Sequence, residues 1–151
     1  MLFPLGPVLL ALLIVLALFT IIFLIAMHRD DNSIVDLAWS PAFIVLALWS
    51  FIRYAAPTRL QTLVTALVII WGCRLYLHLW LRKRGKPEDF RYAAWRKEWG
   101  RSFALRSYLQ IYVVQAVLLT VIALPLLLVN TATTGSLDWS ALIGALVWAF
   151  G

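Results

Sequence analysis

The chain has 151 residues, of which 64% are hydrophobic and 13% are charged. Soluble domains are about half apolar and about a quarter charged, so this composition excludes an ordinary soluble domain and predicts an integral membrane protein. The net charge is +6, and residues 82–106, which hold nine Lys and Arg against three Asp and Glu, account for all of it. A basic loop beside a membrane span has a simpler explanation than nucleic-acid binding, so we expect no nucleic-acid partner.

Long apolar segments predict an all-α transmembrane bundle with four full spans and a partial fifth. A helical span needs about 20 apolar residues, and Pro4 and Pro7 lie where a helix start tolerates proline. The last segment has thirteen residues, which reach only about 20 Å as a helix. We therefore expect residues 1–151 to be a single membrane domain, the N-terminal part of a longer one. The expected full spans are 5–27, 34–52, 60–81 and 107–129, and the partial span is 139–151.

The basic loop also predicts an orientation. Lys and Arg accumulate on the cytoplasmic side of a membrane, so we expect residues 82–106 to be cytoplasmic. Because the third span then ends inside, the N-terminus lies outside, which suits its lack of Lys and Arg before Arg29.

Within the basic loop, residues 87–99 predict an interfacial amphipathic helix. Pro87 suits a first helical position, and Glu88 and Asp89 suit the first turn. Three aromatic residues share one face at spacings of three and four, and we expect this face to lie in the membrane interface. They are Tyr92, Trp95 and Trp99.

Ionisable residues inside the expected spans predict a polar interior. Arg74 lies eight residues before Arg82 on one helix face with His78, about 12 Å deep along the helix. A charge at that depth usually faces the bundle interior or a wet cavity. Asp36 enters the second span from the same side, so we expect Asp36, Arg74 and His78 to be buried polar residues and Asp36 to lie close to Arg74. The open alternatives are a structural ion pair between two helices and a polar cavity that faces the cytoplasm.

The basic loop has two interpretations as well. It is either an interfacial anchor or a binding site for the phosphates of an anionic ligand. For the second interpretation the candidate residues are Arg82, Arg84, Lys86 and Arg91. The two histidines lie fifty residues apart, so we expect no metal site. The single cysteine, Cys73, lies in an apolar segment and is expected to be a small buried side chain.

Three stretches of sequence carry a family resemblance: NSIVDLAWS, WGCRLYLHLWLRKRGKPEDFRYAAWRKEWG and YLQIYVVQAVLLTVIALPL. They resemble the N-terminal half of a bacterial membrane-protein family that is grouped with the steroid 5-alpha-reductase-like proteins. The resemblance implies a seven-helix-like bundle in the bacterial inner membrane. It also implies NADPH bound from the cytoplasm and reduction of a carbon–carbon double bond in a lipid or steroid-like substrate.

By the position of the basic segment after the third helix, the resemblance implies that Arg82, Arg84 and Lys86 contact the cofactor. The family's later Arg-His-Pro-Asn-Tyr-like motif does not occur in this sequence, so the chain resembles the front half of a reductase. Candidates for the catalytic proton donor are Tyr76, Tyr92 and a water held by Asp36, and the sequence does not rank them.

Two other functions stay open. One is a membrane methyltransferase of the isoprenylcysteine type, which resembles the same architecture and uses S-adenosylmethionine. The other is a non-catalytic membrane module whose basic loop binds anionic lipid or a partner.

Overall fold

The computed structural model describes residues 5–54 and 58–151, and Pro4 lies outside the described residues. Every regular element within them is helical. In chain order the elements are α1 (Leu5–His28), α2 (Ile34–Arg53), α3 (Arg59–Lys83), α4 (Phe90–Trp99), the 3-10 turn η1 (Gly100–Ser102), α5 (Phe103–Ser107), the π-helical segment η2 (Tyr108–Val113), α6 (Val114–Ile122), α7 (Leu124–Thr131) and α8 (Trp139–Phe150).

The predicted all-α transmembrane bundle is confirmed. α1, α2, α3 and the helical run from Phe90 to Ile122 are each long and apolar enough to cross a membrane, and α8 is a shorter apolar helix. The expected spans 5–27, 34–52 and 60–81 end within two residues of α1, α2 and α3. The protein is therefore an integral membrane protein.

The predicted fourth span at 107–129 is longer in the structure and is interrupted. From the start of α5 at Phe103 the chain stays helical to Thr131, with a break at Ala123 between α6 and α7. Pro125 follows the break, at the start of α7. Proline has no amide hydrogen and its ring collides with the carbonyl four residues earlier, so the helix restarts there instead of running through.

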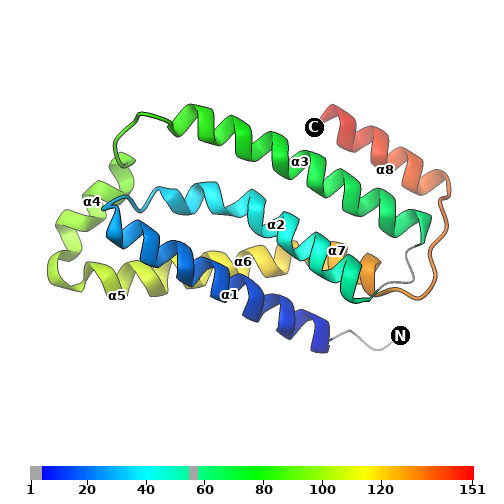
Figure 1. The fold of residues 1–151 in the computed structure, drawn as a ribbon, viewed down its shortest axis with the longest axis horizontal. Helices are drawn as coiled ribbons and strands as arrows, with labels where there is room; N and C mark the ends of the chain where they lie inside the picture. Colours follow the sequence, from blue (N-terminus) through cyan, green and yellow to red (C-terminus); the bar gives the residue numbers. More distant parts are fainter. Residues whose placement is uncertain (1–4, 55–57) are drawn as a thin grey trace.

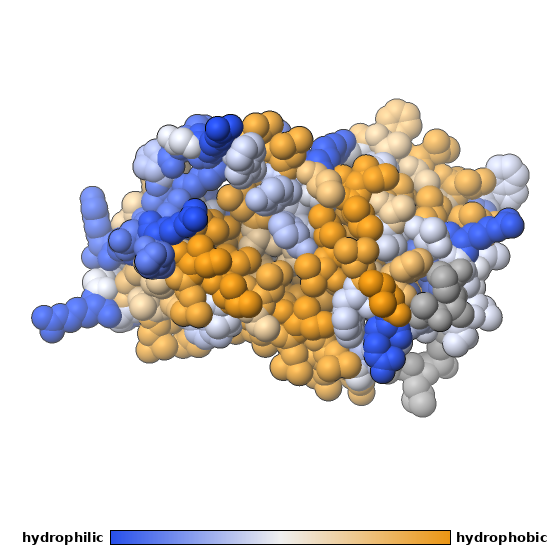
Figure 2. Space-filling view, viewed as in Figure 1, coloured by the Kyte–Doolittle hydropathy of each residue, from blue (hydrophilic) through white to orange (hydrophobic). Residues whose placement is uncertain are grey.

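The helices form one elongated bundle (Figure 1). α1, α2 and α3 run along its long axis, α4 crosses one end, and α5 to α7 return along α1 and α2. α8 lies beside α3 at the outer edge of the bundle. Figure 2 shows an apolar surface over the middle of the molecule and hydrophilic residues at the end where α4 lies, as a bilayer-spanning bundle requires.

Small residues let α2 and α3 pack closely. Gly72 is buried in α3, and a Cβ atom built on it would lie 2.7 Å from Cγ1 of Ile44 in α2. Such contacts are typical of membrane helices, where association depends on close packing of backbones. Gly72 therefore fixes which face of α3 points at α2.

The predicted interfacial helix at 87–99 needs two corrections. It begins at Phe90, and Asp89 caps it by accepting a hydrogen bond from the amide of Arg91, so Pro87, Glu88 and Asp89 precede the helix. Its aromatic face does not point outward: Tyr92 is 3% exposed, and Trp95 and Trp99 pack against the core. The rings of Tyr92, Trp95, Trp99 and Phe103 follow one another with neighbouring centroids 5.5 to 6.0 Å apart. Burial of this apolar area favours the inward orientation of the helix.

Candidate functional site

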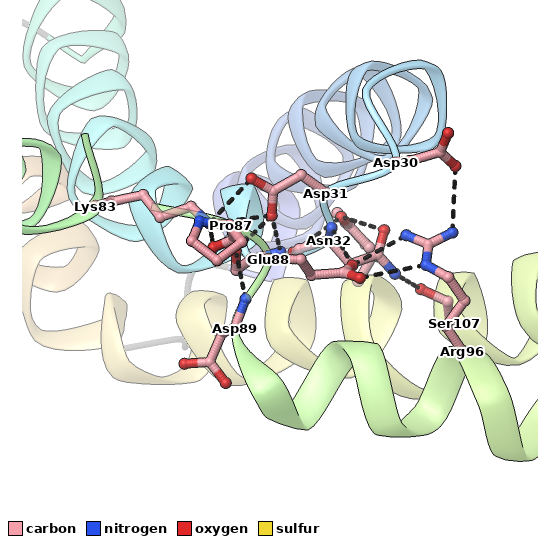
Figure 3. A network of polar contacts seen from close by, with 11 residues as sticks. Asp30, Asp31, Asn32, Lys83, Pro87, Glu88, Asp89, Arg96 and Ser107 are labelled. Carbon is pink, nitrogen blue, oxygen red and sulfur yellow. Dashed lines mark hydrogen bonds and ion pairs between the residues drawn. The ribbon is translucent and has the colours of Figure 1, made fainter. Parts of the chain in front are cut away.

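The loop between α1 and α2 is held against α4, α5 and the residues that precede α4 by partly buried and buried polar contacts (Figure 3). The amide of Asn32 donates to Oε1 of Glu88 at 2.8 Å, and the Asn32 side chain donates to Oγ of Ser107. Arg96 holds the same Glu88 carboxylate through two hydrogen bonds, at 3.2 Å from Nε and 3.0 Å from Nη2. Because Asn32 is entirely buried, these bonds fix the position of α4 relative to α1 and α2. We call Asn32, Glu88, Arg96 and Ser107 the latch.

A second set of contacts places the loop after α3. Nζ of Lys83 lies 3.0 Å from a carboxylate oxygen of Asp31 and donates to the carbonyl of Pro87 at 2.7 Å. Asp30 reaches Arg96 at 3.4 Å. Lys83 thereby ties the end of α3 to the α1–α2 loop, and the chain between Lys83 and Asp89 arches over the first turn of α2.

Under this arch lies a cleft of about 550 Å³, which we call the basic cleft. This size falls in the range of about 300–1,000 Å³ that ligand pockets occupy. Four cations face two carboxylates, so its net charge favours an anion. Its lining residues are Ser33, Asp36, Leu37, Leu79, Arg82, Lys83, Lys86, Pro87, Asp89 and Arg91.

The structure brings three of the four expected phosphate-binding residues together. Arg82, Lys86 and Arg91 line the basic cleft. Arg84 lies outside its lining, with its guanidinium 5.1 Å from the ring centre of Trp80. Within residues 5–54 and 58–151, neither Arg82 nor Lys86 forms an ion pair.

Arg91 is already held by carboxylates. It contacts Asp89 at 3.0 Å and Asp36 at 3.3 Å. Hydrogen bonds from the Arg91 side chain and amide hold the pKa of the Asp89 carboxyl below its usual value. An anionic ligand at Arg91 would have to compete with these carboxylates, so Arg82 and Lys86 are the cations best placed to receive one.

Two of the three proton-donor candidates meet beside the cleft, where Asp36 belongs to its lining and Tyr92 contacts Asp36 from behind that lining. The hydroxyl of Tyr92 donates a hydrogen bond to Oδ1 of Asp36 at 2.8 Å. Tyr92 is buried, whereas 41% of the Asp36 side chain is exposed toward the cleft. Tyr76 is 41% exposed on α3 and lines neither of the two cavities described here.

The expected proximity of Asp36 and Arg74 is wrong. Asp36 pairs with Arg91, and Arg74 is exposed and donates only to the backbone carbonyl of Gly151, at 3.2 Å. His78 and Cys73 are exposed as well, so the expected burial of all three residues is also wrong. The reason is the contact at Gly72: Arg74 follows two residues later, about 200° around the helix, and so points away from α2.

The sequence analysis did not single out three polar residues that line the cleft, which are Ser33, Lys83 and Asp89. It did not single out the latch residues either. The signal for them was the polar segment HRDDNS between the first two spans. Its acidic and amide side chains complement the basic loop, which would have predicted that the two loops pack together.

A second cavity, of about 480 Å³, opens between α2, α3, α7 and α8. It is almost entirely apolar, and its lining includes Phe43, Val68, Trp71, Leu126 and Trp148. Phe43 lies seven residues beyond Asp36 on α2, so the apolar cavity is about 10 Å deeper along the helices than the basic cleft.

Comparison with known proteins gives one family. The family model described as "Protein of unknown function (DUF1295)" matches residues 22–151. No curated protein and no solved structure matches the chain. Among the described residues, no group of three or more His, Cys, Asp or Glu side chains is placed to hold a metal ion.

Proposed function

The chain belongs to the family described as "Protein of unknown function (DUF1295)", and on that premise we propose that it is a membrane-embedded NADPH-dependent reductase of a carbon–carbon double bond in a lipid or steroid-like substrate. The resemblance of its sequence to the steroid 5-alpha-reductase-like proteins supports this reaction class. The observation that carries the proposal is the basic cleft, in which Arg82 and Lys86 face a ligand-sized space without ion-pair partners among the described residues.

The side chains of the cleft fit a phosphate-bearing cofactor. The guanidinium of Arg82 presents a planar fork of donors that matches phosphate oxygens, and the ammonium of Lys86 adds a point charge at the rim. Arg91 would provide a third cation, and its bonds to Asp36 and Asp89 would hold it in place. The basic end faces the cytoplasm in this proposal, since Lys and Arg concentrate there.

NADPH would supply the hydride, and the chain would supply orientation and a proton. Tyr92 is the candidate donor because its buried hydroxyl lies behind Asp36, which lines the cleft, and donates to that carboxylate at 2.8 Å. Asp36 accepts that bond and is also held by Arg91, so it is a positioning residue for the phenol. The apolar cavity deeper along α2 and α3 would accommodate the hydrocarbon of the substrate.

The charge of the cleft also supports one of the two candidate cofactors over the other. S-adenosylmethionine carries a sulfonium cation and no phosphate, so a cleft with four cations does not favour it. This charge supports the reductase over the methyltransferase.

The test measures NADPH binding by the full-length protein in lipid nanodiscs. Arg82→Ala and Lys86→Ala should each weaken binding by about tenfold or more, since a hydrogen bond to a charged group contributes about 1.5–3 kcal/mol. Arg84→Ala is the matched control, because Arg84 is a neighbouring cation outside the cleft, and it should bind as the unmodified protein does. Equal losses in all three variants, or none, would overturn the assignment of the cleft.

An anionic lipid headgroup carries the same phosphate chemistry. The binding measurement is therefore repeated in nanodiscs of phosphatidylcholine alone and with phosphatidylglycerol added. NADPH binding that Arg82→Ala weakens in phosphatidylcholine supports the cofactor site. If the variants change only the association with phosphatidylglycerol, the cleft is a lipid site and the reductase proposal fails.

A further inference from the structure

A polar side chain of the fourth span faces α2 inside the bundle. Gln115 is the second residue of α6, and it is partly buried, whereas Val114 and Val117 beside it are exposed. Its Oε1 accepts a hydrogen bond from the indole N–H of Trp39 in α2 at 2.7 Å. Uncharged polar side chains inside membrane bundles commonly hydrogen-bond across helices, so this contact by itself accounts for a structural link between α2 and α6 and no more.

The bond to Trp39 also fixes the orientation of the Gln115 amide. An indole N–H can only donate, so the amide oxygen must be the atom that faces Trp39, which leaves the amide NH2 group to donate elsewhere. The Gln115 side chain is also a hydrogen-bonding partner of the Tyr92 hydroxyl. That hydroxyl donates its own hydrogen to Asp36 at 2.8 Å, so toward Gln115 the phenol oxygen accepts.

These contacts form a chain in which the direction of every hydrogen bond is defined. Trp39 donates to Gln115, which donates to Tyr92. Tyr92 in turn donates to Asp36. Asp36 and Trp39 lie three residues apart on one face of α2, so the chain of bonds begins and ends on α2 and passes through α6 and α4. Its last member, Asp36, lines the basic cleft.

The π-helical segment η2 supports a functional role for this arrangement. It ends at Val113, two residues before Gln115. Each hydrogen bond of a π-helix spans five residues instead of four, and such segments within α-helices frequently occur at functional sites. Gln110, the other glutamine of this span, lies within η2 and is exposed. The two glutamines of one span therefore have different surroundings.

We propose that Gln115, held by Trp39, is a positioning residue for Tyr92 in the reduction, an inference that rests on the function proposed above. The amide NH2 group holds the phenol oxygen so that the phenol hydrogen points to the cleft side. When the O–H bond of Tyr92 breaks, the proton passes to the substrate that has accepted the hydride, and the electron pair stays on the phenol oxygen. The amide then stabilises the phenolate, because a hydrogen bond to an ionised acceptor is about twice as strong as a neutral one.

The first measurement is NADPH oxidation with a lipid enone by the full-length protein in phosphatidylcholine nanodiscs. Gln115→Leu should lower kcat by about tenfold to a hundredfold, the effect of losing a hydrogen bond to a charged group, and leave the KM for NADPH unchanged. Trp39→Phe should lower kcat less, because the amide remains but loses its anchor. Gln110→Leu is the matched control, as an exposed glutamine of the same span, and its turnover should equal that of the unmodified protein.

The Tyr92→Phe background separates positioning from a purely structural role. Phenylalanine has no hydroxyl to position, so adding Gln115→Leu should lower the remaining turnover by no more than about twofold. A structural link between α2 and α6 would be lost equally in both backgrounds. Equal losses of kcat in the two backgrounds would therefore overturn the inference, as would a loss that appears in the KM for NADPH instead of in kcat.

A second measurement follows the Trp39 indole N–H by NMR without cofactor. In protein with isotope-labelled tryptophan, the indole resonance that is missing from Trp39→Phe belongs to Trp39. It should shift in Gln115→Leu and also in Tyr92→Phe, because Gln115 joins the two rings, and it should stay in place in Gln110→Leu. A resonance that does not respond to Tyr92→Phe would overturn the inference.

The two measurements also distinguish this inference from the proposed function. If the unmodified protein oxidises no NADPH with any lipid enone, the reductase proposal fails, and the catalytic role of Gln115 fails with it even where the indole resonance shifts as expected. If the unmodified protein oxidises NADPH and Gln115→Leu leaves kcat unchanged, the reductase proposal stands and only the role of Gln115 is overturned.

Discussion

The hydroxyl of Tyr92 donates a hydrogen bond to Oδ1 of Asp36 at 2.8 Å, which joins the first turn of α4 to the first turn of α2. Asp36 in turn meets Arg91 at 3.3 Å. The carboxylate, which lines the basic cleft, therefore orients a buried phenol directly behind it, and this geometry leads to the first prediction.

Tyr92→Phe should reduce turnover by about a hundredfold or more, the range for loss of a general acid, without changing NADPH affinity. The reason is that the substitution removes one hydroxyl and none of the cations. Turnover is measured as NADPH oxidation with a lipid enone, beside NADPH binding. Tyr76→Phe is the control, because Tyr76 lies outside the cleft, and a loss of turnover equal to that of Tyr92→Phe would contradict the assignment.

Breaking the latch should destabilise the bundle. Glu88→Gln and Arg96→Gln should each lower the free energy of unfolding by about 1–3 kcal/mol, because each leaves a partly buried charged group without its partner. The double variant should lose less than the sum of the single losses, since the two side chains interact directly. Thermal unfolding in detergent gives the values, and strictly additive losses would show that the pair is uncoupled. Glu98→Gln, at an exposed position of the same helix, should have little effect.

The cap of α4 should make stability depend on acid pH. The pKa of Asp89 is lower in the folded protein than the usual aspartate value of 3.8, chiefly because Arg91 donates hydrogen bonds to the carboxylate. The unfolded state therefore binds the proton first as pH falls, and the stabilisation is present above about 3.8 and is lost as pH drops through the folded pKa. Unfolding measured from pH 6 downward should show this loss in the unmodified protein. The Asp89→Asn variant should lack this pH-dependent stabilisation. Identical curves of stability against pH for the variant and the unmodified protein would contradict the prediction.

The contact at Gly72 should tolerate no larger side chain. A Cβ there would lie 2.7 Å from Ile44 Cγ1 and 3.3 Å from the carbonyl oxygen of Ser40. We expect Gly72→Ala to destabilise the bundle by about 1–3 kcal/mol, the usual effect of overpacking. Ile44→Ala in the same chain should restore part of this loss by removing the colliding atoms. A melting temperature unchanged by Gly72→Ala would show that α2 and α3 do not pack as described.

The orientation is tested by labelling. In a Cys73→Ser background, Lys97→Cys places one thiol on the exposed side of α4. A membrane-impermeant thiol reagent should label it only after the cytoplasmic side is opened, because the basic end is expected to face the cytoplasm. Labelling in intact cells would reverse the orientation, and with it the side from which the proposed cofactor enters.

The sequence alone determined the fold class and the position of most helices. Spans need a fixed number of apolar residues, so 5–27, 34–52 and 60–81 could be predicted to within two residues. It also indicated the basic loop as a candidate site. Three of the four residues expected to bind phosphate do line one cleft, and their binding of phosphate stays a prediction. These properties depend on composition and on distance along the chain, which a sequence states directly.

Only the tertiary structure decided which residues meet across the bundle. Asp36 was expected near Arg74, but the rotation of α3 about its axis places Gly72 against α2 and Arg74 outside. Helical spacing defines which residues share a face, yet it does not define which neighbour that face contacts. The buried glycine was the one sequence feature that could have indicated the rotation.

The same limit applies to α4. The spacing correctly predicted that Tyr92, Trp95 and Trp99 share one face of the helix. Whether that face contacts lipid or protein depends on the latch, to which the α1–α2 loop contributes Asn32. Lys83 contacts Asp31 and Glu88 contacts Asn32, and each of these pairs is separated by more than fifty residues in sequence. Such pairings follow from the packing of α1, α2 and α4 together, because an ion pair forms only where the backbone brings both charges within reach.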